Sequence, residues 1–535
     1  NGALTDGTYA KFPNLDGYTR LEMGSGDLGK IPAILKGQMF VAAYDSGGGF
    51  LEATGVQIQG VLDDRYATTA TLGLTYTAGA PALTLWAPTA QSVTLHRYTT
   101  PTATTGVTSA LAFDANTGVW SITGEASWDR DFYLYEVEVY VPETGQVERN
   151  FVTDPYAVSL SLNPFEDGRI ANTQRAQFVD LAGDATLQPA GWDALAKPPL
   201  DAPEDASIYE LHIRDFSIAD STVPAALRGT FAAFTDPDTA GMQHLQALAD
   251  AGLTHLHLLP ANDIGSIVES AAQREDTPDL SAYPAASMRQ QQEVAEVRGS
   301  DGFNWGYDPQ HYGLPEGAYS TDPDGPQRIL EFRQMVQALN QNGLRLVLDV
   351  VYNHTYRAGQ ESGSVLDRVV PGYYHRYDND GHLYNTSCCA DTAAEFEMME
   401  KLIVDTITRW ATAYKVDGFR FDLMNLHTVS NVEAVQDAVR ALTTTTDGVD
   451  GGSILLYGEG WDFGSAADKG LNYAKQWNAA GTGVGTFNDK IRDAAHGGYS
   501  TDDLAIRHQG FINGLSFDWN GYEYASRDQA ALFYE

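Results

Sequence analysis

The N-terminal third of the chain alternates apolar and polar positions in short runs that are separated by turn residues. Residues 131–141 (DFYLYEVEVYV) are the clearest case, because tyrosines and valines at odd positions alternate with even positions that include two glutamates. Residues 83–98 and 118–125 are β-rich runs of similar length. Successive side chains of a strand point to opposite faces, so a period of two predicts strands with one buried face. Short strands at this spacing predict a β-sandwich over residues 76–180, preceded by a β-rich domain over residues 1–75.

A different pattern begins at residue 207, after a polar linker over residues 181–206. Apolar strand-like runs now alternate with helical segments. The strand-like runs are 207–217, 253–260, 344–354, 416–424 and 453–462, and the helical segments are 241–252, 326–343 and 395–414. Repetition of strand, helix and strand predicts parallel strands with helical crossovers. We therefore expect an α/β fold over residues 207–535, and the number of repeats favours a (β/α)8-type barrel over an open sheet.

Three successive strand-like runs end on ionisable side chains. Each run has one such carboxyl group at or near its carboxyl end, namely Asp349, Asp422 and Glu459. The carboxyl ends of the strands form the active-site face of a (β/α) barrel, so these three carboxyl groups should meet in one mouth. Gathering carboxylates in a poorly solvated place is unfavourable, and such clusters are candidates for functional sites.

Arg420 stands two residues before Asp422, in the run VDGFRFDLM. Residues i and i+2 of a strand share a face, so this pair should lie together, with the flanking phenylalanines on the other side. A neighbouring guanidinium lowers the pKa of a carboxyl group and keeps it ionised, although a plain buried ion pair would show the same pattern. Asp422 as an ionised nucleophile and Glu459 as a poorly solvated acid suit glycoside hydrolysis.

Composition and charge narrow the classes of function. Apolar residues make up 43% of the 535 residues, which is ordinary for a packed globular protein, and the length suggests roughly three domains. The formal net charge of −38 argues against nucleic acid or anionic lipid as a partner. No apolar run is long enough to span a membrane. The only cysteines, Cys388 and Cys389, are adjacent, and they form either a vicinal disulfide or two thiols without zinc-ligand spacing.

Four motifs resemble those of a known family. DVVYNH (349–354), GFRFD (418–422) and GEGW (458–461) resemble the first three conserved regions of the α-amylase superfamily, glycoside hydrolase family 13. FNWGYDP (303–309) resembles the signature of its debranching group, the type I pullulanases and limit dextrinases, with Phe303 where tyrosine is common. The resemblance covers nearly the whole chain, because the N-terminal part is similar to that group's N-terminal domain and carbohydrate-binding sandwich.

The resemblance implies roles for the residues at the strand ends. Asp422 would be the nucleophile that forms a covalent glycosyl-enzyme, and Glu459 would be the general acid and base. Arg420 would hold Asp422 in place and ionised. Asp349 would be a structural support near the same sugar-binding subsite.

The resemblance also implies residues that contact the sugar. His354 would donate a hydrogen bond to the sugar in subsite −1, and Tyr307 would stack beneath its ring. Apart from the resemblance, the coincidence of Trp305, Tyr307 and Trp461 with the candidate acids favours a role as walls for an apolar sugar face. Asn353 matches a position that often ligates calcium in the superfamily, although no further calcium ligands can be identified. No organic cofactor is implied.

Two departures from the superfamily pattern affect the expected specificity and completeness. Amylases usually carry Lys-His three and four positions after the nucleophile, where this chain has Asn425 and Leu426. We therefore expect hydrolysis of α-1,6-glucosidic bonds in pullulan, amylopectin or limit dextrins.

The fourth conserved region of the superfamily ends in His-Asp, and this dipeptide is absent from the sequence. We expect the chain to be a fragment of a longer enzyme with an incomplete barrel.

The alternatives are an isoamylase, a branching transferase of the same superfamily, and a non-catalytic glucan-binding protein. The protein is expected to be a monomer that is secreted or at the cell surface of a bacterium.

Overall fold

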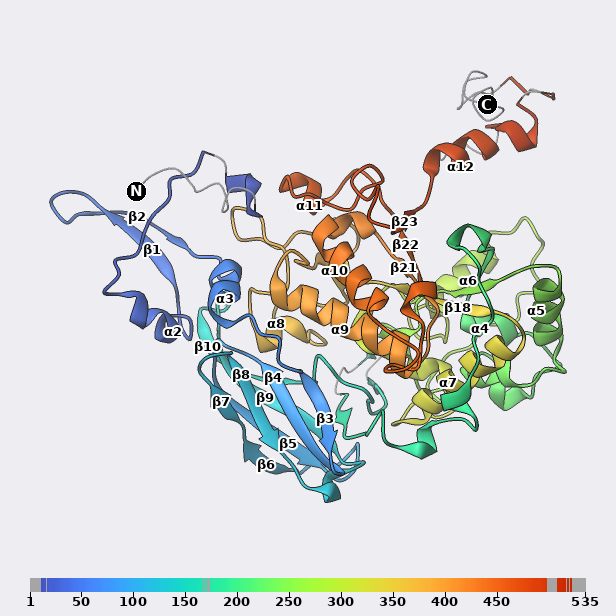
Figure 1. Cartoon of the computed structure of the whole chain (residues 1–535), viewed down its shortest axis with the longest axis horizontal. Coiled ribbons are helices and arrows are strands. Elements are labelled where there is room, and N and C mark those ends of the chain that lie inside the picture. Colours follow the sequence, from blue (N-terminus) through green and yellow to red (C-terminus); the bar gives the residue numbers. More distant parts are fainter. Residues whose placement is uncertain are drawn as a thin grey trace. The chain divides into compact units, whose positions relative to one another are not determined.

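The computed structural model describes residues 11–15, 17–166, 169–170, 174–497, 508–515, 517–518 and 520–521. It divides into two compact units, Asn1–Val484 and Gly485–Glu535. The predicted strands and helices from residue 83 to residue 462 lie in the first unit (Figure 1). No helix in the described part of the chain is both long and apolar enough to cross a membrane.

The chain begins with a hairpin and short helices. Strands β1 (Phe40–Tyr44) and β2 (Phe50–Gly55) pair antiparallel, between helices α2 (Ile31–Ile34) and α3 (Gln59–Tyr66). The hairpin exposes much of its apolar surface, including Phe40 and Phe50. Helix α3, in contrast, buries Leu62 and Tyr66 against the rest of the unit. In the described residues before β3, which starts at Gly73, the β-rich character expected for this part consists of one two-stranded ribbon.

Two antiparallel sheets follow (Figure 1). The first sheet has the order β3-β4-β8-β7, with bounds Gly73–Thr77, Ala80–Trp86, Val119–Thr123 and Ala112–Asp114. The second has the order β10-β9-β5-β6, with bounds Gln146–Val152, Phe132–Val141, Ala90–Tyr98 and Val107–Ala110, and β13 (Ala176–Gln177) also pairs with β9. The odd positions of β9 are fully buried, as the period of two predicts.

The polar segment over residues 181–206 lies against the body of the first unit. It contains short 3₁₀ turns, and Leu187 and Trp192 are buried. Arg333 donates hydrogen bonds to the carbonyl oxygens of Leu181 and Leu187, and Lys415 donates to that of Trp192. The segment therefore wraps the neighbouring structure, although its composition is that of a linker.

A parallel sheet forms the centre of the remaining chain. In the first unit it has the order β14-β15-β18-β21-β22, with bounds Ile208–Leu211, His255–Leu258, Arg345–Val350, Gly418–Phe421 and Leu455–Gly458. Every pair in this order is parallel. The strands β15, β18 and β21 are buried on both faces, which is usual for parallel sheets covered by helices.

Helices connect these strands. The longer ones are α5 (Ala240–Asp250), α7 (Gln327–Gln341), α9 (Glu397–Ala413) and α10 (Val429–Arg440). Shorter elements are α4 (Ile213–Ser217), α6 (Arg289–Val297), α8 (Leu366–Val369), α11 (Ser465–Asp468), and the strands β16 (Asn262–Ile264), β17 (Pro309–Pro315), β19 (His354–Thr355) and β20 (Ala390–Asp391). The paired dipeptides β11 (Phe165–Glu166) and β12 (Arg169–Ile170) complete the first unit.

The strand–helix alternation and the parallel pairing confirm the α/β prediction for this part. The predicted strand over residues 207–217 is shorter, because the chain turns into α4 at Ile213 after an N-terminal cap by His212. In the second unit the described elements include β23 (Gly485–Thr486) and helix α12 (Asp489–His496). The segment after residue 521 lies outside the described residues.

Candidate active site

The register of three neighbouring strands brings the predicted residues to one end of the sheet. Asp349 of β18 stands beside Arg420 of β21, and Phe421 stands beside Gly458 of β22. Asp422 and Glu459 each follow the last residue of their strand. The peptide nitrogen of Asp422 donates to the carbonyl oxygen of Val350, and that of Glu459 donates to Phe421. The backbone ladders therefore carry both carboxyl groups to the same sheet end.

Arg420 contacts all three carboxyl groups. Its Nη1 donates to Asp349 Oδ1 and to Asp422 Oδ1, each at 2.9 Å, and its Nη2 lies 2.9 Å from Glu459 Oε1. The phenylalanines on either side of Arg420 are buried, as the strand alternation predicted. The Asp422 and Glu459 carboxyl groups thus face the two terminal nitrogens of one guanidinium, which places them side by side.

The pKa of Asp422 differs from the sequence-based expectation. Burial raises the pKa of the Asp422 carboxyl, and the negative charge of Asp349 raises it further, while Arg420 and a hydrogen bond from Asn353 oppose this shift. The expectation of a lowered pKa was wrong because burial disfavours the charged carboxylate and because Arg420 is shared among three carboxyl groups. Burial also raises the pKa of Glu459, again against Arg420. A raised pKa suits a group that must donate a proton near neutral pH.

Asn353 and His354 connect Asp422, the candidate nucleophile, to Tyr307, which is expected to stack beneath the sugar. Asn353 Nδ2 donates to Asp422 Oδ2 at 2.8 Å, and its Oδ1 is hydrogen-bonded to His354 Nδ1. His354 Nε2 lies 2.7 Å from the carbonyl oxygen of Tyr307, and the Tyr307 hydroxyl donates to Asp349 Oδ2 at 2.8 Å. Arg420, which contacts both Asp349 and Asp422, closes these bonds into a ring that fixes Asp422, Asn353, His354, Tyr307 and Asp349 relative to one another.

Leu423, the residue after Asp422, has a left-handed backbone with φ of 39°. Side chains other than glycine rarely adopt this conformation, and such strain often gathers at functional sites. The conformation allows the peptide nitrogen of Leu423 to donate to Glu459 Oε2 at 3.0 Å. The strained turn therefore links the backbone of one candidate catalytic residue to the side chain of the other.

The two candidate tryptophans differ in exposure. Trp305 is 63% exposed, and Trp461, two residues after Glu459, is half-buried. An exposed indole at the rim offers a flat apolar surface that a sugar ring can stack on. Along the sequence, Trp305 stands two residues before Tyr307, and Trp461 stands two residues after Glu459.

His257 and Tyr457 also belong to this site, and the sequence reasoning missed them. His257 Nε2 lies 3.6 Å from Asp349 Oδ2, and the Tyr457 hydroxyl lies 3.5 Å from His257 Nδ1. The available signal was a pair of histidines in the apolar run THLHLLP, at a strand end like those of Asp349 and Asp422.

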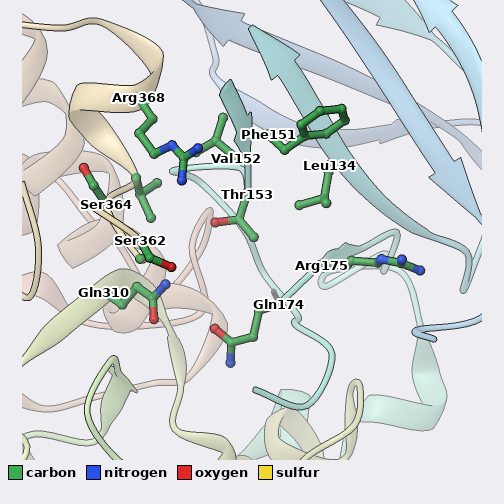
Figure 2. A pocket seen from close by; sticks show the side chains of 12 residues that line it. Leu134, Phe151, Val152, Thr153, Gln174, Arg175, Gln310, Ser362, Ser364 and Arg368 are labelled. Carbon is green, nitrogen blue, oxygen red and sulfur yellow. The ribbon is translucent and has the colours of Figure 1, made fainter. Parts of the chain in front are cut away.

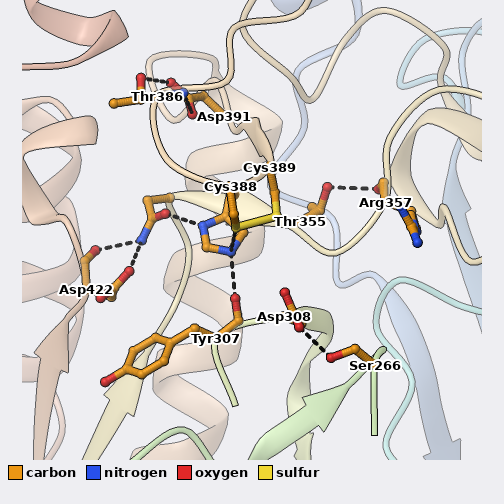
Figure 3. The surroundings of a disulfide bond; sticks show 12 residues. Ser266, Tyr307, Asp308, Thr355, Arg357, Thr386, Cys388, Cys389, Asp391 and Asp422 are labelled. Atoms are coloured by element: carbon orange, nitrogen blue, oxygen red, sulfur yellow. Dashed lines mark hydrogen bonds between the residues drawn. A yellow bond between two sulfur atoms is a disulfide. The ribbon is translucent and has the colours of Figure 1, made fainter. Parts of the chain in front are cut away.

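Cys388 and Cys389 are joined by a disulfide bond next to this site. Figure 3 shows the bond above Tyr307, with Asp422 to the side. Cys388 Sγ lies 3.7 Å from His354 Nε2. The pairing resolves the choice between a disulfide and two thiols, and it ties up the thiolates that a metal would need.

The structure gives Asn353 a role other than the one expected. Both polar ends of its amide are engaged, by Asp422 and by His354. Calcium at this position stays a prediction without support from the donor set.

Comparison with known proteins identifies relatives along the whole chain. Residues 1–64 match the pullulanase N2 domain, and residues 71–157 match carbohydrate-binding module 48, the isoamylase N-terminal domain. The chain is 44% identical to pullulanase 1, chloroplastic, of Arabidopsis thaliana over 533 residues, covering 98% of this chain and 54% of the relative. It is 35% identical to the pullulanase of Klebsiella pneumoniae, covering 97% of this chain and 50% of the relative.

Solved structures show the same relationship. The Klebsiella pneumoniae pullulanase complexed with maltotriose superposes with a TM-score of 0.89 at 35% identity, covering 98% of this chain and 52% of that one. The pullulanase PulA of Klebsiella oxytoca gives the same values. The chain spans about half the length of the curated relatives it matches.

Proposed function

We propose that this chain, a homologue of the pullulanases over almost its whole length, acts as a starch-debranching glycoside hydrolase on α-1,6-glucosidic bonds. The observation that carries the proposal is the shared Arg420, which holds the Asp422 and Glu459 carboxyl groups side by side. Retaining glycosidases use two carboxyl groups about 5–5.5 Å apart, one as nucleophile and one as acid and base.

The proposed reaction is a double displacement. Glu459, whose pKa is raised by burial, protonates the oxygen of the scissile bond as Asp422 attacks the anomeric carbon. A covalent glycosyl-enzyme forms, and Glu459, now ionised, removes a proton from the water that releases the sugar. Arg420 and Asn353 both donate to Asp422 and favour its ionised form.

Asn425 and Leu426 support the debranching specificity. The Asn425 amide donates to the carbonyl oxygen of Phe463 at 2.8 Å, and both side chains are buried. Neither position therefore offers a charged group to the aglycone, unlike the Lys-His pair expected of an α-1,4-amylase. The maltotriose in the Klebsiella relative is an α-glucan fragment, and this supports an α-glucan as the substrate here.

The test is the release of reducing ends from pullulan by the full-length protein. Asp422→Asn and Glu459→Gln should each lower kcat at least about 100-fold, because each removes one half of the acid and nucleophile pair. Matched controls are Asp437→Asn and Glu433→Gln on the exposed face of α10, which should leave kcat unchanged. Full activity in either of the first two variants would refute the roles assigned here.

The same assay separates the alternative functions. A branching transferase would rearrange chains without a net gain of reducing ends, and a non-catalytic glucan-binding protein would bind amylopectin without turnover. A retaining mechanism further requires that a 2-fluoro glucosyl fluoride, as a slow substrate, leaves a glycosyl adduct on Asp422 that mass spectrometry can detect.

The proposal also includes the expectations about the barrel, calcium, the oligomeric state and the location. The parallel sheet is proposed to be part of a (β/α)8 barrel, on the support of its strand order and its pullulanase neighbours. Calcium binding, a monomeric state and a secreted or cell-surface location in a bacterium stand as proposals too. The relatives include a chloroplastic protein of a plant and pullulanases of bacteria.

A further inference from the structure

A pocket distinct from the candidate active site lies in the first unit. It has a volume of about 370 Å³ and is lined by residues of β9 and β10, of the segment before β13, of β17, and of α8 with the loop that leads into it (Figure 2). The described lining residues are Leu134, Phe151, Val152, Thr153, Gln174, Arg175, Gln310, Ser362, Gly363, Ser364, Val365 and Arg368. None of the residues that line the proposed catalytic centre is among them.

Several buried polar atoms of this pocket lack a hydrogen bond. They are Gln174 Oε1, Gln310 Oε1, Ser364 Oγ and Arg368 Nε. The residues Gln174, Ser364 and Gln310 are only 2%, 4% and 8% exposed. Native structures pair nearly all buried polar atoms, so four unpaired atoms around one cavity point to a missing partner.

The charge of the lining identifies the chemistry of that partner. The Arg368 guanidinium forms no hydrogen bond or ion pair with the described residues, and burial alone lowers its pKa. No Asp or Glu is among the described lining residues, in a chain with 71 acidic and 33 basic side chains. An unpaired, partly buried guanidinium without a neighbouring acid favours an anionic ligand. Arg175 turns away, and its guanidinium is engaged by the carbonyl oxygens of Thr100 and Ala103.

The volume of the pocket and its other lining residues indicate a ligand larger than a simple inorganic anion. Pockets of about 300 Å³ and above hold whole small molecules. Leu134 and the 48% exposed Phe151 lie on one face of the sheet and form an apolar side. The amide oxygens of Gln174 and Gln310 can accept hydrogen bonds from hydroxyl groups. A sugar ring with one apolar face and many hydroxyl groups matches this combination, with an anionic substituent toward Arg368.

We propose that this pocket binds a phosphorylated hexose, with Arg368 and Ser364 holding the phosphate and the two glutamines holding hydroxyl groups. A phosphate monoester offers three strong acceptor oxygens and a charge of about −1.5 to −2. The phosphorylated hexose can be a free sugar phosphate or a phosphate-bearing unit of a glucan. The inference goes beyond the proposed hydrolysis and does not depend on it.

The test uses the full-length protein with Glu459→Gln, so that hydrolysis cannot disturb the measurement. Titration calorimetry with glucose 6-phosphate should show binding, and glucose should show none. Arg368→Gln should weaken the binding roughly tenfold or more, because it removes a charge-assisted contact. Ser364→Ala should weaken it less. The matched control is Arg149→Gln, an arginine of β10 that is largely exposed, which should leave the affinity unchanged.

Thermal unfolding of the ligand-free variants separates binding from a structural role. Arg368→Gln should leave Tm unchanged or raise it, because a partly buried cation without a partner destabilises the folded state. A clear fall in Tm would show that Arg368 supports the fold, and this would overturn the proposal. Absence of glucose 6-phosphate binding, or equal binding by Arg368→Gln, would also overturn it.

A glucan-binding assay distinguishes the two sources of the ligand. Retention on phosphorylated amylopectin is compared with retention on the same amylopectin after phosphatase treatment. A difference that Arg368→Gln abolishes supports a phosphate ester on the glucan. Equal retention together with glucose 6-phosphate binding supports a free sugar phosphate, and equal retention without such binding refutes both.

Discussion

Arg420 is one cation among three carboxyl groups. The protonation of these groups therefore depends on how much of their negative charge one guanidinium can compensate. If Asp349, Asp422 and Glu459 were all ionised, two negative charges would remain uncompensated in a poorly solvated place. Like charges at close range disfavour full ionisation, so the cluster tends to keep a proton. Burial raises the pKa of both Asp422 and Glu459, in agreement with this view.

Asp349→Asn should move the acidic limb of the kcat/KM profile to lower pH. In the proposed mechanism Asp422 attacks only when ionised, so activity should rise as pH rises through its pKa. The charge of Asp349 is the second-largest cause that raises this pKa. Removing that charge lowers the pKa, although kcat also falls because Asp349 anchors Arg420. The pH profile on a small chromogenic glucoside measures the shift, with Asp437→Asn as the control. An acidic limb that stays in place or moves upward would contradict the electrostatic account.

At the scale of elements, the close approach of β21 and β22 positions Glu459. A Cβ atom on Gly458 would lie 2.6 Å from the carbonyl oxygen of Phe421 and 2.9 Å from its Cβ. Glycine is therefore required for the two strands to lie this close. Leu423, whose backbone is left-handed, then donates a hydrogen bond from its peptide nitrogen to the Glu459 carboxyl group.

Gly458→Ala should push the end of β22 away from β21. Glu459 would then leave Arg420 and Leu423, and kcat should fall about 100-fold or more, since misplacement by about 1 Å can have such an effect. Because the clash involves backbone atoms, Tm should fall too. Gly448→Ala, where nothing lies near the added Cβ but φ is 72°, controls for general glycine strain. Unchanged kcat in Gly458→Ala would contradict the packing argument.

The sequence was sufficient for the elements whose periodicity is strong. The alternation in β9, the helices α5, α7 and α9 and the strands β15, β18, β21 and β22 were predictable because burial imposes a period on each element. Helix α10 and strand β17 were not predicted. The meeting of Asp349, Asp422 and Glu459 was predictable from parallel strand ends. The hydrogen bonds of Asn353, the approach of His257 and the raised pKa of Asp422 were not, since they depend on tertiary distances and on how many charges share one cation.

At the scale of the whole molecule, Asp63 ties the N-terminal part to the helices beside the parallel sheet. Asp63 of α3 is buried and accepts a hydrogen bond from the Tyr373 hydroxyl, over a sequence separation of 310 residues. It also accepts from the peptide nitrogen of Glu397, the first residue of α9, at 3.3 Å. A carboxylate at a helix N-terminus is stabilised by the helix dipole.

Asp63→Ala should therefore destabilise the protein as a whole. It leaves the Tyr373 hydroxyl buried without its acceptor and removes the contact with the start of α9, which together should lower stability by about 1–3 kcal/mol. The expected fall in Tm is measurable by differential scanning calorimetry. Asp64→Ala changes the adjacent exposed carboxylate and should leave Tm nearly unchanged. Equal Tm values for the two variants would show that the N-terminal part contributes little to the rest.

The surplus of negative charge around Arg420 has a consequence for inhibitors. A sugar mimic with a basic nitrogen in its ring becomes a cation on protonation, and the cluster of three acids around one guanidinium attracts such a cation more than the neutral parent sugar. Iminosugars should thus bind more tightly than glucose of the same shape, and added salt should weaken them only slightly in so enclosed a place.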